Sequence, residues 1–253
     1  MSRFVDPPQL PVIDLSLFEA GDPWRDHVAA QVDWAAAEFG LFSVVGHGVE
    51  AELIERVNTL GRAAVSRSGA GVEFNALHDA REFPRVPGFR EAAADYLQAL
   101  SGLSHRLLTS VGRSLKCSDN FFVDHHTGEP RVQWRLRADH GGLQSVPAGL
   151  VVIDQLDEAV ALQVLYDGAK WLDVPGIPGA LVCRIGKSLE SLSAGRYRAV
   201  PIRTIVRAEQ VGLAVPFAFD GAAGSDRAVM EIQHSLRVVR RPDAALSYSY
   251  GCG

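Results

Sequence analysis

Residues 162–182 read LQVLYDGAKWLDVPGIPGALV, a stretch in which short apolar runs are separated by turn-forming residues. Pro175 and Pro178 favour an extended link outside a hydrogen-bonded ladder, and Gly179 permits the turn into the next run. Comparable runs occur at 131–137, 150–154, 160–166, 180–185, 202–206 and 212–219. Many short strands at close spacing, with no long helix between them, predict a β-sandwich or a jelly-roll barrel.

The sequence before this region has a helical pattern. Asp22 and Pro23 are typical of a helix start, and apolar residues recur at helical spacing from Val28 to Phe39. Further amphipathic helices are predicted from Leu53 to Ala64 and from Tyr96 to Leu115. One short strand is expected at 41–45 and an irregular loop at 66–88. The predicted order is therefore helices first and β-structure second, an α+β arrangement.

Length and composition favour one domain with a large core. The chain has 253 residues, of which 47% are hydrophobic. We expect a single domain over 1–253, divided into a mainly helical part (1–125), a β-rich core (126–220) and a C-terminal tail (221–253).

Several classes of protein are excluded by charge and pattern. A net charge of −5 argues against a nucleic-acid binder. No run of about eighteen apolar residues occurs, which argues against a membrane span, and the residues after Met1 do not resemble a signal segment. Three widely spaced cysteines do not suggest a disulfide framework, so we expect a cytoplasmic protein.

Particular motifs resemble the isopenicillin-N-synthase-like family of non-haem Fe(II), 2-oxoglutarate-dependent oxygenases. They occur in the family's order and nearly at its spacing: LPVIDLS (10–16), EFGLF (38–42), GHGV (46–49), PGFR (87–90), LQVL (162–165), WLDVP (171–175), PGALV (178–182) and GRYR (195–198). The resemblance implies a double-stranded β-helix, which is a cupin-like jelly roll, with N-terminal helices packed around it. It covers most of residues 10–220.

The resemblance also implies where the family's chemistry would lie. Family members hold Fe(II) with two His and one Asp, the first two as His-x-Asp. At those positions this chain has Ser145, Pro147 and Ile202. The Arg-x-Ser that grips 2-oxoglutarate in the family corresponds to Gly212 and Ala214. The chain is thus identified as a diverged member that lacks the iron triad, and we expect neither metal nor cofactor.

A second alignment remains open for the first ligand pair. Arg137-Ala138-Asp139-His140-Gly141 can be aligned as an altered His-x-Asp-x-Gly, which keeps Asp139 as a ligand. This alignment leaves about twenty residues before Leu162, longer than the family usually has. Ile202 and Gly212 are unchanged by the choice.

The expected site is the mouth of the barrel. We expect the pocket to be lined by Ser145, Pro147, Ile202, Gly212 and Ala214, with Arg135, Arg137 and Tyr166 available to bind an anionic substrate. Asp139 and His140 are the candidate catalytic residues, because a positioned acid or base accelerates proton transfer.

These observations lead to one expected function and two alternatives. We expect a metal-independent, redox-neutral enzyme that catalyses the cyclisation or isomerisation of a small molecule, or an elimination reaction, as in natural-product biosynthesis. One alternative is a non-catalytic partner subunit of an active oxygenase, and the other is an oxygenase with non-standard iron ligands such as Asp139 and His140. The expected partners are a small-molecule substrate and, for the partner role, a homologous oxygenase or a second copy of the chain.

Overall fold

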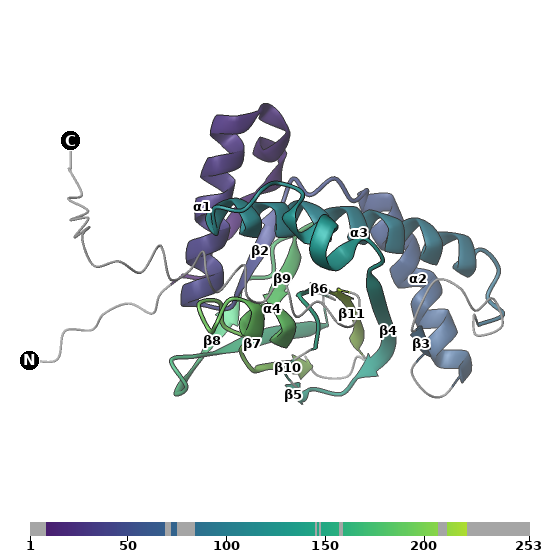
Figure 1. The fold of residues 1–253 in the computed structure, drawn as a ribbon. Coiled ribbons are helices and arrows are strands. Elements are labelled where there is room, and N and C mark those ends of the chain that lie inside the picture. The colour runs from purple at the N-terminus through teal and green to yellow at the C-terminus, as the bar shows by residue number, and fades with distance from the viewer. Residues whose placement is uncertain are drawn as a thin grey trace, which may run out of the picture.

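The computed structural model describes residues 9–68, 72–74, 84–144, 146, 148–156, 159–206 and 212–221. Within these residues two sheets face each other (Figure 1). The larger sheet has the strand order β1-β2-β9-β6-β11-β4-β3, and the smaller has the order β5-β10-β7-β8. This pair of sheets is the jelly-roll core, so the predicted fold class is confirmed.

The strands are short, as the sequence pattern predicts. The larger sheet contains β1 (Val12–Asp14), β2 (Leu41–Val45), β3 (Val72–Phe74), β4 (Arg131–Asp139), β6 (Val151–Gln155), β9 (Leu181–Ile185) and β11 (Gly212–Asp220). The smaller sheet contains β5 (Gly142–Gln144), β7 (Val160–Tyr166), β8 (Lys170–Val174) and β10 (Ile202–Val206).

Helices cover one face of the larger sheet (Figure 1). They are α1 (Asp22–Glu38), α2 (Ala51–Ser68) and α3 (Phe89–Ser114), together with the 3-10 helix η1 (Leu15–Ala20), the π-helical turn η2 (Val123–Thr127) and the short α4 (Lys187–Leu192). Their apolar stripes and the outer side chains of the sheet form the main core. Trp134 of β4 is fully buried there and stacks on Phe89 with ring centroids 6.0 Å apart.

A second, smaller apolar cluster lies between the two sheets. It joins Leu162 and Val164 of β7 to Val182 of β9 and Ile202 of β10. Ile202 is paired with Val164 on one side and with Gln144 on the other. This register places the end of β5 beside the start of β10.

Most of the predicted elements are confirmed, with three differences. Strands β1, β3, β5 and β8 were not predicted as separate strands. The expected loop at 66–88 contains the end of α2 and strand β3, while 75–83 lie outside the described residues. Gly21, not Asp22, is the N-cap of α1, and Asp22 lies in the first helical turn. Of the tail at 221–253, only Gly221 is described.

No helix in the described part of the chain is both long and apolar enough to span a bilayer.

Candidate functional site

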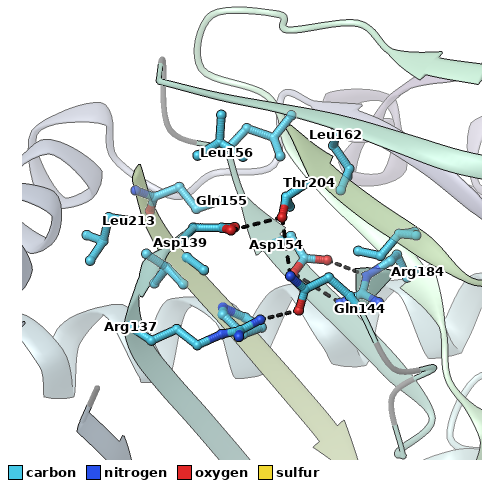
Figure 2. A pocket seen from close by; sticks show the side chains of 15 residues that line it. Arg137, Asp139, Gln144, Asp154, Gln155, Leu156, Leu162, Arg184, Thr204 and Leu213 are labelled. Atoms are coloured by element: carbon cyan, nitrogen blue, oxygen red, sulfur yellow. Dashed lines mark hydrogen bonds and ion pairs between the residues drawn. The ribbon is translucent and has the colours of Figure 1, made fainter. Parts of the chain in front are cut away.

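A cavity of about 50 Å³ lies inside the barrel, between the two sheets (Figure 2). Its polar side chains come from β4, β5, β6, β9 and β10, and they are Arg137, Asp139, Gln144, Asp154, Gln155, Arg184 and Thr204. Leucine, valine and isoleucine side chains form much of the remaining wall. We call this space the inner cavity.

Strand β4 contributes to both the core and the inner cavity, because successive side chains of a strand point to opposite faces. Trp134 and Leu136 are buried on the helix side of the sheet. Arg137 and Asp139 lie on the other face and line the inner cavity. The register pairs Asp139 with Gly212 and Arg137 with Ala214 of β11.

A chain of hydrogen bonds crosses the inner cavity from β4 to the small sheet (Figure 2). Arg137 donates to Gln144 Oε1, and Gln144 Nε2 donates to Thr204 Oγ1 over 3.2 Å. Thr204 Oγ1 donates to Asp139 Oδ1 over 2.9 Å, and the Gly141 amide donates to the same oxygen over 2.8 Å. The other carboxylate oxygen, Asp139 Oδ2, is buried without a hydrogen-bond partner among the described residues.

An ion pair between β6 and β9 forms another wall. Asp154 pairs across the ladder with Val182, and Arg184 pairs with Val152, so the two charged residues are diagonal neighbours on one face of the sheet. Arg184 Nε donates to Asp154 Oδ2, and Nη2 donates to Oδ1 over 3.1 Å. The third guanidinium nitrogen, Nη1, is buried without a partner in the described structure.

A wider groove of about 790 Å³ lies next to the inner cavity, and both are lined by Gln155, Leu156 and Val160. Tyr96 donates to Gln155 Oε1 over 2.8 Å, and Gln155 Nε2 donates to Asn58 of α2. Burial raises the pKa of the Tyr96 hydroxyl, so this group stays protonated and remains a donor. The two bonds hold Gln155 at the boundary between the groove and the inner cavity.

The structure brings together only part of the predicted site. Arg137, Asp139, Ile202 and Ala214 line the inner cavity. Gly212 lies at its edge, beside Asp139 and Val160. Ser145 and Pro147 lie outside the described residues.

Three other predicted residues are placed elsewhere. The Tyr166 hydroxyl donates to Glu38 Oε1 over 2.6 Å, and its ring packs on Phe39. Arg135 and His140 are exposed and are not part of the inner-cavity wall. Of the two candidate catalytic residues, only Asp139 lines the inner cavity.

The described residues do not fit the iron and 2-oxoglutarate set that the resemblance implies. No group of three or more His, Cys, Asp or Glu side chains suitable for a metal ion occurs among the residues the structure describes. Ile202 has no metal-binding atom. A Cβ atom at Gly212 would collide with Val160 Cγ2, so an arginine at 212 could not be accommodated without displacing the Val160 side chain. Asp139 is the one position from the second alignment that reaches the inner cavity as a carboxylate.

Sequence reasoning missed five polar cavity residues: Gln144, Asp154, Gln155, Arg184 and Thr204. Asp154 and Arg184 each interrupt an otherwise apolar strand. A charged residue within an apolar strand needs a partner when it is buried, so this pattern could have indicated the pair. The contact itself depends on the register of β6 and β9.

Comparison with known proteins gives matches in both halves of the chain. Residues 10–67 match the model of the N-terminal region of non-haem dioxygenases of morphine synthesis, and residues 128–214 match the 2OG-Fe(II) oxygenase superfamily. The two segments together make up more than half of the chain.

Individual relatives agree with these models. Flavanone 3-dioxygenase 2 of Oryza sativa subsp. japonica is 27% identical, over 82% of this chain and 72% of the relative. A 1-aminocyclopropane-1-carboxylate oxidase of Dictyostelium mucoroides is 21% identical, over 76% of each chain. Among solved structures, the complex of dioxygenase for auxin oxidation 1 of Arabidopsis thaliana with 2-oxoglutarate superposes with a TM-score of 0.71 at 16% identity, covering 85% of this chain and 93% of that one. This last likeness shows the fold.

These findings correct the functional expectation and settle the family. The proteins just named are dioxygenases or oxidases, one of them in complex with 2-oxoglutarate, so the expectation of a metal-independent, redox-neutral cyclase, isomerase or lyase is wrong. With both segments matched in their proper order and the same fold, the chain belongs to the 2OG-Fe(II) oxygenase superfamily.

Proposed function

We propose that the chain is an oxidoreductase of the oxygenase type that acts on a small molecule held in the inner cavity and the adjoining groove. The observation that carries the proposal is the polar cavity inside the barrel of a chain whose N-terminal segment and β-rich core both match oxygenase models. Concave sites with apolar walls and a few placed polar groups are the usual small-molecule sites. Relatives named as acting on small molecules support the same class of substrate.

The chain's own residues would bind and orient the substrate. The buried Asp139–Thr204–Gln144 chain fixes hydrogen-bonding groups on one side of the inner cavity, and Arg184 supplies a donor on another. Leu156, Val160 and Leu162 supply apolar wall for the substrate.

The test combines a metal assay with turnover. The full chain is purified after expression in iron-supplemented medium, and iron content is measured by mass spectrometry. Oxygen uptake and succinate formation are then followed with Fe(II), 2-oxoglutarate and, in turn, a flavanone, 1-aminocyclopropane-1-carboxylate and an auxin. Asp139→Asn tests the cavity, and Arg203→Gln is the matched control, because Arg203 bonds to Gln163 and lies over Trp171, away from the cavity.

The proposal expects iron-dependent oxygen uptake that Asp139→Asn lowers at least tenfold and Arg203→Gln leaves unchanged. Absence of iron binding, together with absence of oxygen uptake and succinate for all three compounds, would overturn it.

A second candidate is a non-catalytic partner of an oxygenase that holds iron, and a specific observation favours it. Ile202 and the Gly212–Val160 contact occupy space that the resemblance assigns to an iron ligand and an anion clamp. Affinity purification of the tagged chain from its source cells tests this role. Stoichiometric recovery of a homologue with an intact His-x-Asp and His set supports it, and recovery of the chain alone as a monomer contradicts it.

A further inference from the structure

We propose that the inner cavity recognises an α-amino-carboxylate head group, with the carboxylate bound by Arg184 and the ammonium group bound by Asp139. The inference rests on the proposed function only in placing the substrate in this cavity, and it names the class of ligand. It follows from two buried atoms of opposite character, Arg184 Nη1 and Asp139 Oδ2, neither of which has a hydrogen-bond partner in the described structure.

The Arg184 guanidinium group has one nitrogen that takes no part in the ion pair with Asp154. The residue is 5% exposed, and two of its nitrogens, Nε and Nη2, are fixed on the Asp154 carboxylate. This fork orients the guanidinium, leaving Nη1 to donate to something else. Burying a charged donor without an acceptor is unfavourable, so a ligand carboxylate that reaches Nη1 would be bound strongly.

Asp139 offers the complementary atom. It is 3% exposed, and its Oδ1 already accepts from the Thr204 hydroxyl and the Gly141 amide. These two bonds fix the plane of the carboxylate, so Oδ2 is held in one position. A carboxylate oxygen only accepts hydrogen bonds, so its partner must be a donor. An ammonium group is a donor of opposite charge.

The size of the inner cavity fits a head group and not a whole molecule. A volume of about 50 Å³ has room for roughly four waters. An α-carbon with its carboxylate and amine is a group of similar size. The adjoining groove, at about 790 Å³, can take the remainder of the molecule past Gln155, Leu156 and Val160.

The charge of the lining favours a zwitterion. The lining contains two cations, the buried Arg184 and the exposed Arg137, and two anions, Asp139 and Asp154. The described lining is thus balanced, and a ligand with no net charge keeps it balanced. A dicarboxylate such as 2-oxoglutarate would add two negative charges and would supply no donor to Asp139 Oδ2. Uncompensated charge in a buried site is costly, so the amino acid is favoured.

The experiment is calorimetric titration of the iron-free full chain with matched pairs of compounds. 1-Aminocyclopropane-1-carboxylate is compared with cyclopropanecarboxylate, L-alanine with propionate, and 2-oxoglutarate is titrated separately. We expect each amino acid to bind at least tenfold more tightly than its deaminated counterpart and more tightly than 2-oxoglutarate.

Variants separate the two contacts. Asp139→Asn should reduce the affinity for the amino acids at least tenfold and change that for the deaminated acids less than threefold. The double variant Asp154→Leu/Arg184→Met, which removes the ion pair without leaving a lone charge, should abolish binding of both. Arg203→Gln is the control and should bind as the parent does, and the thermal melt of each variant verifies folding.

Equal affinity for the amino and deaminated acids, tighter binding of 2-oxoglutarate, or no heat with any compound at millimolar concentration would overturn the inference. Because the titration needs no iron, oxygen or turnover, a failure of this inference can be distinguished from a failure of the proposed function. Amino-acid binding without oxygen uptake would contradict only the proposed function. Oxygen-dependent turnover of a compound without an amino group would contradict only this inference.

Discussion

Two arginine–carboxylate clusters in this protein differ in one respect. In the first, Asp33 of α1 accepts three bonds from Arg196 and one from the buried Tyr197 hydroxyl, at 2.6–3.1 Å, and ties the helix to the segment after α4. In the second, Asp154 holds Arg184 inside the barrel, but Arg184 Nη1 and Asp139 Oδ2, which belong to residues lining the same cavity, remain without partners among the described residues.

The difference indicates different roles. A buried polar group normally has its hydrogen bonds satisfied, and an exception calls for an explanation. The Asp33 cluster is complete and connects two parts of the fold, so it is structural. The cavity cluster is incomplete on the side that faces a cavity, so it is suited to a ligand.

The largest expected effect comes from breaking the cavity pair. Arg184→Met leaves the Asp154 carboxylate buried without its cation, and we expect the free energy of unfolding to fall by about 3–5 kcal/mol. Chemical denaturation measures it. The double variant Asp154→Leu/Arg184→Met should return to within about 1 kcal/mol of the parent, since replacing a buried pair by apolar groups is often neutral. A double variant as unstable as the single one would show that the pair is structural.

Asp33→Ala should have the next largest effect. The substitution removes the carboxylate that the Tyr197 hydroxyl and the partly buried Arg196 bind. We expect the free energy of unfolding to fall by about 2–3 kcal/mol. Burial is the main cause that raises the pKa of Tyr197, so ionisation cannot relieve the loss at neutral pH. Amino-acid affinity measured by calorimetry should be unchanged. A drop in affinity without unfolding would contradict the separation of roles.

His47 is another polar residue whose ring nitrogens both have hydrogen-bond partners. Its environment predicts that the stability of the fold depends on pH. Its Nε2 donates to Gly179 O over 2.7 Å and its Nδ1 accepts from the Val49 amide, an arrangement that needs the neutral ring. Burial is the largest cause that lowers the pKa of His47 below its usual 6.5. The unfolded chain therefore takes up a proton first as the pH falls, so the stabilisation is complete above pH 6.5 and is lost below it.

Substituting His47→Gln should flatten part of the fall in melting temperature between pH 7 and pH 5, and at pH 8 it should cost about 1 kcal/mol. An unchanged pH profile would show that His47 is not the titrating group.

The smallest effect is expected at the surface. Asp26 is exposed and shares Arg113 with Asp22 and Asp119. Asp26→Ala should lower the free energy of unfolding by less than about 0.5 kcal/mol, since exposed ion pairs contribute little. If Asp26→Ala lowered the free energy of unfolding by as much as Asp33→Ala, the buried cluster would contribute no more to stability than the surface ion pairs.

The sequence predicts the fold better than the site, for a physical reason. Apolar runs predict strands such as 160–166 and 202–206 because burial on a sheet face requires them. Strand β5 has three residues, too few to give a periodic signal. Strand β8 lies within the WLDVP motif, and the sequence pattern does not distinguish it from the adjoining turn residues.

The site depends on the pairing of distant strands. Arg137, Asp139 and Ile202 were predicted and line the inner cavity. The Asp154–Arg184 contact arises from the register of β6 and β9, and the Gly212–Val160 contact from the approach of two sheets. Single-sequence patterns do not specify either arrangement, so Arg135, His140 and Tyr166 were expected in a pocket that they do not line.

A crystal structure of the iron-free chain grown with 1-aminocyclopropane-1-carboxylate tests most directly whether the incomplete cluster is a ligand site. We expect density for the amino acid in the inner cavity, with its carboxylate within roughly 3.2 Å of Arg184 Nη1 and its nitrogen within roughly 3.2 Å of Asp139 Oδ2, which is hydrogen-bond distance. Ordered water bridging these two atoms in the presence of saturating amino acid would contradict it.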